Sequence, residues 1–140
     1  MPLFHWTKQY AVHLPEIDAE HRAIFMAGAE LERAAAAHAP KSRLREMIRA
    51  LVNHAEDHFA HEERMMREVR YAAFDWHKKQ HDGVRRRLKQ FGKRIEANDR
   101  EAPGEMLEYL AHWLHGHTAI TDRMMGARLR NFHREHKRIS

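Results

Sequence analysis

The sequence of 140 residues contains no cysteine, only four prolines and only six glycines. Without cysteine the chain has no disulfide bonds and no thiolate metal sites, so histidine and carboxylates are its only strong metal ligands. Proline and glycine are the residues that interrupt helices, and their scarcity leaves long segments free to be helical. Any metal bound by this chain is therefore held by nitrogen and oxygen atoms.

Long apolar runs are also missing. The opening stretch MPLFHWTKQY lacks the basic patch and apolar core of a signal peptide, and no later stretch has the length of a membrane span. We therefore expect a cytoplasmic protein with no membrane insertion.

The formal net charge is +5, with dense basic stretches at GVRRRLKQFGKR and RLRNFHREHKRIS. Consecutive arginines on a helix point in different directions, and basic residues outside an apolar stripe usually form a solvated face rather than a phosphate-binding track. We therefore expect no nucleic-acid partner. The basic C-terminal segment, residues 125–140, is a candidate contact for a protein partner, and the sequence leaves the oligomeric state open.

Helix-forming residues dominate the chain, and no segment alternates as a β-strand does. Short connections between long helices favour antiparallel neighbours. We predict an all-α, up-down-up-down antiparallel four-helix bundle in a single domain of residues 1–140, with Ser42 and Asp75 as helix caps. The predicted parts are an N-terminal arm over 1–17 and a bundle over 18–124, with helices near 18–37, 42–70, 75–97 and 103 to at least 120.

Histidine is the residue in excess, with 14 copies. Each predicted helix has an inward seam at steps of three and four residues, and these seams are apolar except at six positions. Burying six polar side chains without partners would cost about 1 to 3 kcal/mol each, whereas a shared metal ion satisfies them together. In an up-down-up-down bundle all six lie at the same end, so the seams predict a metal site there. The six are His21, His58, Glu62, His77, His81 and His117.

The second helix leaves a choice of ligands, because His54 and His61 flank His58 at permitted helical spacings. The helix face that carries Glu62 is more apolar than the face that carries His61, so we prefer Glu62. His54 and His61 stay open as alternatives at this point.

The fourth helix poses a geometric problem in the stretch HWLHGHTAITD. At about 100° per residue, His117 lies within about 20° of Leu110 on the inward face, whereas His112 and His115 face outward. Asp122, five residues after His117, lies about 140° round the helix from it. A regular helix does not bring both side chains to one point, but a wide turn with i to i+5 hydrogen bonds does.

The chain resembles the hemerythrin family, in particular its single-domain bacterial members. The likeness is carried by FHWTKQYAVHLPEIDAEH, HFAHEERMM, WHKKQH and WLHGHTAITD, which follow the family's order and spacing over nearly the whole chain. It implies two iron ions in a non-heme di-iron centre with a bridging oxo or hydroxo group. The implied function is reversible binding of O2, for carriage, storage or local supply.

The resemblance also implies roles for individual residues. One iron has three histidine ligands, the other has two and an open position for O2, and two carboxylates bridge both. The three-histidine iron is bound by His77, His81 and His117, and the iron with the open position is bound by His21 and His58. The bridging carboxylates are Glu62 and Asp122. Including Asp122 predicts an irregular helix between Gly116 and Asp122. The residues expected to line the O2 pocket are Ile24, Phe59, Val84, Trp113, Leu114, Thr118 and Ile120.

Two positions depart from the family's pattern. Val84 stands where the family often has an aromatic residue, and Thr118 stands where it often has isoleucine. A smaller and more polar pocket admits water more readily, so we expect faster autoxidation.

The sequence favours a binding protein over an oxidase on one ground. The chain contains no Glu-x-x-His pair of the kind that ferritin-like di-iron oxidases use. Two alternatives stay open at this point: a di-iron enzyme that reduces O2, peroxide or nitric oxide, and an O2-responsive interaction module.

Overall fold

Helices make up most of the chain in the computed structural model, which describes residues 3–139 and the side chains up to residue 135. No strand occurs in that part of the chain, and none of its helices is both long and apolar enough to cross a membrane. The predicted all-α class is confirmed. In chain order the elements are the 3-10 helix η1 (Lys8–Tyr10), α1 (Pro15–Ala36), α2 (Lys41–Glu68), α3 (Phe74–Glu96), α4 (Ala102–Gly116), the π-helix η2 (His117–Asp122) and α5 (Arg123–Ile139).

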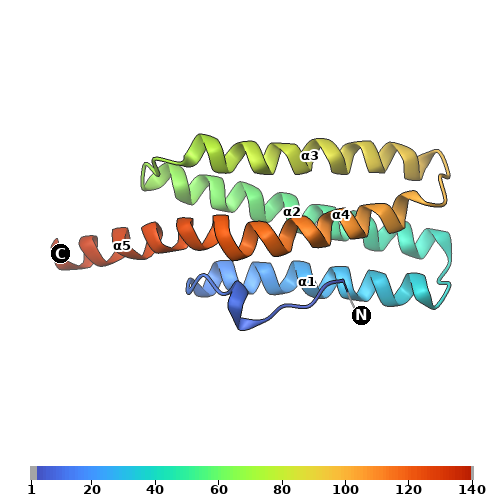
Figure 1. The fold of residues 1–140 in the computed structure, drawn as a ribbon, viewed down its shortest axis with the longest axis horizontal. Coiled ribbons are helices and arrows are strands. Elements are labelled where there is room, and N and C mark those ends of the chain that lie inside the picture. The colour runs from blue at the N-terminus through green and yellow to red at the C-terminus, as the bar shows by residue number, and fades with distance from the viewer. Residues whose placement is uncertain (1–2, 140) are drawn as a thin grey trace.

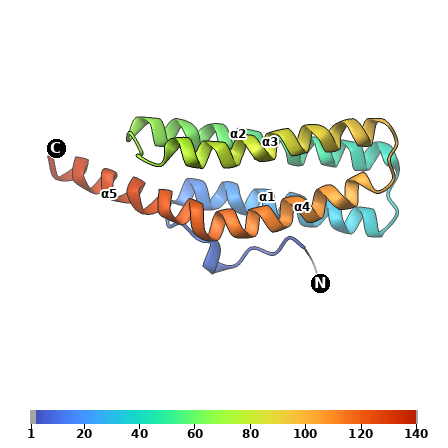
Figure 2. The same ribbon diagram turned by 45° about the horizontal axis from the view of Figure 1, so that its top comes forward.

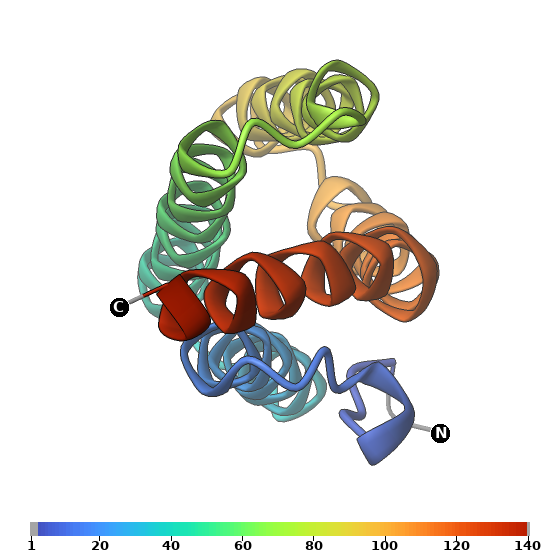
Figure 3. The same ribbon diagram turned by 90° about the vertical axis from the view of Figure 1, so that its left-hand side faces the viewer.

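The four long rods of the fold are α1, α2, α3 and the continuous run from α4 through η2 to α5. Successive rods alternate in direction along the long axis of the molecule (Figure 1). Seen from one end, they stand around a common axis, and α5 crosses over that end towards α2 (Figure 3). The predicted four-helix bundle is therefore confirmed.

The starts of α2 and α3 differ from the predicted caps. Pro40 precedes α2 and Ala73 precedes α3, and neither makes a side-chain capping bond, so the assignment of Ser42 and Asp75 as caps is wrong. Pro40 is the N-cap residue of α2, with the non-helical angles φ −56° and ψ 146°, so Ser42 already lies inside the first turn of the helix.

The inward seams of the helices were predicted well as far as His117. On α3, steps of four and three residues from His77 reach six positions, and all six are buried: His77, His81, Val84, Leu88, Phe91 and Ile95. Beyond His117 the inward face moves by one residue, because the π-helix adds a residue to its turn. Continued at steps of three and four residues, the inward seam beyond His117 would include Ile120 and Met124. Ile120 is 63% exposed and Met124 is 51% exposed, so a regular seam is wrong there. The buried positions in this part are Thr118, Thr121, Asp122, Met125, Gly126 and Leu129.

The N-terminal arm runs along the outside of α1 and α4 (Figures 1 and 2). Phe4 is buried against Gly28 of α1, where any Cβ atom would overlap the phenyl ring. Tyr10 stacks on Phe25 with ring centroids 5.5 Å apart. The arm thus covers the bundle with aromatic side chains.

Helix α5 continues the fourth rod beyond the bundle (Figure 2). Its side chains Met125 and Leu129 pack with Met66 of α2 and with Val69, the residue after α2, in a small apolar cluster of their own. Of the basic segment predicted over 125–140, residue 140 and the side chains of 136–139 lie outside the described residues. The described part of α5 closes the bundle at the end where α2 meets α3.

Candidate metal centre

Five histidines and two carboxylates are buried together near the end of the bundle that α5 closes. All seven are at most 5% exposed, and they come from α1, α2, α3 and η2. The structure therefore brings together every side chain that the family resemblance implied as a ligand. They are His21, His58, Glu62, His77, His81, His117 and Asp122.

Glu62 turns its two carboxylate oxygens towards different histidines. Its Oε1 atom lies 3.1 Å from His81 Nε2 and 3.6 Å from His77 Nε2. Its Oε2 atom lies 3.2 Å from His58 Nε2 and 3.6 Å from His21 Nε2. One carboxylate thus serves two separate groups of imidazoles.

Asp122 divides its oxygens in the same way. Its Oδ1 atom lies 2.9 Å from His117 Nε2 and 3.1 Å from His77 Nε2, while Oδ2 lies 3.0 Å from His21 Nε2. Separations near 3 Å are those of neighbouring ligands around one ion with bonds of about 2.1 Å.

The side chains consequently form two groups, each able to hold one ion. Within each group, one ligand atom per residue can be chosen so that these atoms all lie within 4.8 Å of one another. Both groups contain Glu62 and Asp122, and no histidine belongs to both. The first group adds His77, His81 and His117, and the second adds His21 and His58.

The π-helix is what places Asp122 in the cluster. It spans His117–Asp122, which confirms the irregular helix predicted between Gly116 and Asp122. Its wider turn brings His117 and Asp122 to the same side of the rod, where a regular α-helix would separate them.

Outer polar side chains fix the orientation of three of the imidazoles. His58 Nδ1 donates to Glu20 at 2.7 Å, His81 Nδ1 donates to Glu63 at 2.8 Å, and His117 Nδ1 donates to Gln80 at 2.7 Å. With the proton on Nδ1, the Nε2 lone pair of each ring points into the cluster, as metal binding requires.

Sequence reasoning missed these three outer partners. Glu20, Glu63 and Gln80 are each adjacent in the chain to a predicted ligand. Side chains at such flanking positions more often form the solvated edge of a helix, so the pattern gave no reason to single them out.

Several atoms of the cluster are buried without a hydrogen-bond partner among the described residues. They include both oxygens of Glu62, Oδ1 of Asp122, and Nε2 of His21 and of His81. Buried polar atoms that lack partners are costly, and here acceptor lone pairs from all sides face a common space. Two cations fit this donor set, because nitrogen and carboxylate oxygen ligands would satisfy them and leave no acceptor unpaired.

In the metal-free cluster, protonated histidines offset the negative charges of the two buried carboxylates. Burial alone would raise the pKa of Glu62, but the neighbouring histidines, His58 first, hold that pKa well below its usual range. Burial opposes protonation of His58 and His77, yet Glu62 and Asp122 raise their pKa values to about 10 and about 9. For His117, burial prevails and lowers the pKa. Protons thus occupy, in part, the space that metal cations would fill.

Two aromatic side chains cover the three-histidine group. Phe59 stacks on His81 with ring centroids 4.2 Å apart, and Trp113 stacks on His117 at 4.1 Å. Phe59 and Trp113 also meet edge to face at 5.4 Å. This pair therefore lines one side of the three-histidine group.

The residues expected to line an O2 pocket are mostly buried. Trp113 is half-buried. Ile120 is exposed, so its assignment to a buried pocket is wrong. The cause is the one-residue shift of the inward face that the π-helix produces. The fully buried members are Ile24, Phe59, Val84, Leu114 and Thr118.

The other histidines considered in the sequence analysis lie outside the cluster. His54 and His112 are exposed, and His61 bonds to Glu20 instead of reaching the centre. His115 is not turned to solvent as expected, because it faces the N-terminal arm. Its Nε2 donates to the carbonyl oxygen of Leu3 at 2.9 Å, and its Nδ1 accepts a bond from the Tyr10 hydroxyl at 2.6 Å.

Comparison with known proteins agrees with this geometry. Residues 12–129 match the family model described as Hemerythrin HHE cation binding domain. The chain belongs to the hemerythrin family. The description of that model says that the domain binds cations, and in this chain the buried histidines and carboxylates are the residues that could hold them.

Hemerythrin relatives resemble the chain over most of its length. It is 28% identical to a bacteriohemerythrin of Stenotrophomonas maltophilia, covering 98% of this chain and 91% of the relative. It is 27% identical to a bacteriohemerythrin of Clostridium acetobutylicum, covering 86% and 97%. A myohemerythrin of Theromyzon tessulatum is 29% identical over 85% of this chain and 88% of its own length.

Proposed function

We propose that this chain is a non-heme di-iron protein that binds O2 reversibly. The observation that carries the proposal is the orientation of Glu62 and Asp122. Each carboxylate places one oxygen near the three-histidine group and the other near the two-histidine group. Carboxylates arranged in this way bridge two ions.

The proposed ligand sets differ by one histidine. His77, His81 and His117 would hold the first iron and His21 and His58 the second, and Glu62 and Asp122 would each supply an oxygen to both. The second group would hold its iron with one histidine fewer than the first, which would leave room for O2 at that ion.

Two ferrous ions supply the two electrons that reversible O2 binding requires. The chain supplies the ligands, their orientation and a dry surrounding. Glu20 and Glu63 hold His58 and His81 in the tautomer that presents Nε2 to the metal. Phe59 and Trp113 exclude water from one side of the centre, which opposes irreversible oxidation.

The ligand set favours binding over reduction of O2. Ferritin-like oxidases surround their irons with carboxylates and use Glu-x-x-His pairs, whereas this cluster has five imidazoles and only two carboxylates. We therefore propose a binding protein and not an enzyme.

The proposal is tested by cycling O2 over the iron-loaded protein. The protein is reduced without oxygen, O2 is added and then removed, and the visible spectrum is followed throughout. We expect an oxygenated spectrum that disappears on removal of O2 and returns on its addition. Direct conversion to the oxidised form with consumption of reductant would contradict binding and support the enzyme.

The identity of the metal is tested separately, by producing the protein in cells supplied with both iron and zinc and measuring the metal content of the purified protein. We expect about two irons per chain, bound in preference to zinc. Two zinc ions per chain under these conditions would contradict the assignment of iron while leaving the two-ion geometry intact.

A further inference from the structure

One arginine of α3 contacts two of the side chains that surround His81. The Nη1 atom of Arg85 donates to Glu63 Oε2 at 2.8 Å. The same oxygen accepts the Nδ1 proton of His81, also at 2.8 Å. The Arg85 guanidinium group lies over the ring of Phe59, 5.5 Å from its centroid, and Phe59 in turn stacks on His81. Arg85 thus reaches His81 through a carboxylate and through an aromatic ring.

Further acidic side chains hold Arg85 in this position. Its Nε atom donates to Glu56 and its Nη1 atom also donates to Asp82, both at 2.8 Å. Lys78 donates to the other oxygen of Asp82 at 2.7 Å. Although burial opposes it, these carboxylates raise the pKa of Arg85 further above its ordinary range. Arg85 therefore brings a permanent positive charge to a defined place between α2 and α3.

The two-histidine group has an outer partner of a different kind. Glu20 accepts the Nδ1 proton of His58 with one oxygen, and its other oxygen lies 2.6 Å from His61 Nδ1. The charge of a histidine depends on whether it is protonated, whereas an arginine is always charged. The two groups of metal-site histidines are therefore surrounded by different charges.

Glu63 and Arg85 act on the His81 ring in opposite directions. A carboxylate that accepts the Nδ1 proton of a histidine makes Nε2 more basic, and a more basic imidazole favours ferric over ferrous iron. Arg85 weakens this effect of Glu63, because it binds the same oxygen that His81 uses. Its positive charge also repels the ferric ion more strongly than the ferrous ion.

We propose that Arg85 is a positioning residue that acts through Glu63 to raise the reduction potential of the iron bound by His81, and so favours the ferrous state. Ferrous iron is the state that the proposed O2 binding requires. The proposal rests on the di-iron centre proposed above, but its test does not depend on whether O2 binds reversibly.

The reduction potential of the iron-loaded protein is measured by redox titration under argon. Arg85→Met removes the charge and the hydrogen bonds of the side chain. We expect the ferric state to become favoured about tenfold, which is a fall of about 59 mV for a one-electron couple. An unchanged or higher potential would overturn the proposal. A protein that shows this fall but does not bind O2 reversibly would contradict only the proposed function.

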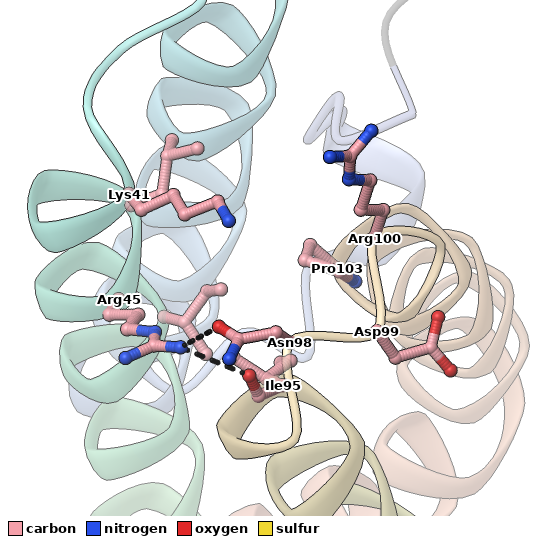
Figure 4. Close-up of a pocket in the computed structure, with 9 residues that line it drawn as sticks. Lys41, Arg45, Ile95, Asn98, Asp99, Arg100 and Pro103 are labelled. Atoms are coloured by element: carbon pink, nitrogen blue, oxygen red, sulfur yellow. Dashed lines mark hydrogen bonds between the residues drawn. The ribbon is translucent and has the colours of Figure 1, made fainter.

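Arg45 offers a matched control, because it is also a half-buried arginine that joins α2 to α3. It donates to the carbonyl oxygen of Ile95 at 3.2 Å and to Asn98 at 2.8 Å, as Figure 4 shows. Arg45 precedes Glu62 by seventeen residues on α2, which is about 25 Å at 1.5 Å per residue.

Arg45→Met removes the same charge and also breaks a contact between the helices. It should shift the ferrous–ferric equilibrium less than about twofold, because Arg45 is farther from the metal ligands than the Debye length of about 8 Å. Equal shifts in Arg45→Met and Arg85→Met would show that only net charge matters and would contradict the role of Arg85.

The path through Glu63 is tested by comparing opposite changes. Glu63→Gln should raise the potential, whereas Arg85→Met should lower it. A general loosening of the site would not move the potential in opposite directions, so a fall in both variants would refute the proposal. The rise in Glu63→Gln is measured independently of how well Arg85→Met folds.

A double variant completes the test. In the Glu63→Gln protein there is no carboxylate for Arg85 to offset, so adding Arg85→Met should shift the equilibrium less than about threefold. Arg85→Lys keeps the charge and should likewise shift it less than about threefold. A full tenfold shift by Arg85→Met in the Glu63→Gln protein would show that Arg85 does not act through Glu63.

Discussion

His117 and Asp122 stand five residues apart in the chain, yet His117 Nε2 lies 2.9 Å from Asp122 Oδ1. In a regular α-helix, positions five apart point about 140° away from each other. The π-helix His117–Asp122 removes this separation and moves the inward face of the rod by one residue. The position of the ligand Asp122 and the choice of which later side chains face the core therefore depend on the same six residues, those of the π-helix.

The packing register is tested by truncating two adjacent methionines. Met125 is fully buried and Met124 is 51% exposed. We expect Met125→Ala to lower the free energy of unfolding by about 2 to 5 kcal/mol. Met124→Ala should change it by less than about 0.5 kcal/mol. Urea unfolding of the metal-free proteins measures both, and a larger loss for Met124→Ala would contradict the shifted register.

The bridging role of Asp122 is tested by Asp122→Asn. The amide keeps the size of the side chain but lacks the charge and has only one oxygen, so it cannot bridge two ions. Iron content should fall from about two per chain to one or fewer. Asp57→Asn, an exposed change on α2, should keep two. Two irons in the Asp122→Asn protein would show that the bridge is not needed.

Periodicity was enough to predict the inner faces of α1, α2 and α3, because regular helices in a bundle repeat their buried positions. It placed His21, His58, Glu62, His77 and His81 correctly in the interior. It failed beyond His117, because the π-helix changes the period and nothing in a regular repeat reports such a change. Asp122 was found only through the family resemblance.

The outer partners were hidden for a different reason. Whether a glutamate beside a ligand faces solvent or a neighbouring helix depends on the rotation of two helices about their axes. That rotation is a property of the packed bundle, so Glu20 and Glu63 became recognisable only in the structure.

The contribution of Glu63 is tested by Glu63→Gln. This carboxylate accepts the Nδ1 proton of His81 and an Arg85 bond, both at 2.8 Å. Losing its charge should weaken metal binding about 10- to 100-fold, measured by competition with a chelator. Glu56→Gln is the matched control, because Glu56 bonds to Arg85 and to none of the cluster histidines. Equal effects of the two changes would mean that Arg85, and not His81, is what matters.

The metal-free protein should lose stability as pH rises. Although burial opposes it, the carboxylates raise the pKa of His58 and His77 from 6.5 to about 10 and about 9. Because these folded-state values are raised, their stabilisation is complete below pH 6.5 and is lost as pH rises through about 9 and 10. In the metal-loaded protein, the histidines bind as neutral imidazoles and this loss should be absent. Urea unfolding with and without metal measures both, and parallel pH profiles would refute the charge pairing.

Thr118 is predicted to shorten the life of the oxygenated form. Its hydroxyl is buried without a hydrogen-bond partner among the described residues, next in sequence to His117. Replacement by an apolar side chain of the same shape, Thr118→Val, should slow autoxidation several-fold by making the pocket drier. The rate is read from the decay of the oxygenated spectrum in air. An unchanged rate, or an oxygenated form of the unmodified protein that lasts for hours, would contradict this expectation.

The central claim is that two metal ions share Glu62 and Asp122. A crystal structure of the iron-loaded protein tests it most directly. The account predicts two irons, one bound by His77, His81 and His117 and the other by His21 and His58, with each carboxylate giving one oxygen to each iron. A single ion, or a carboxylate whose oxygens both bind the same ion, would contradict it.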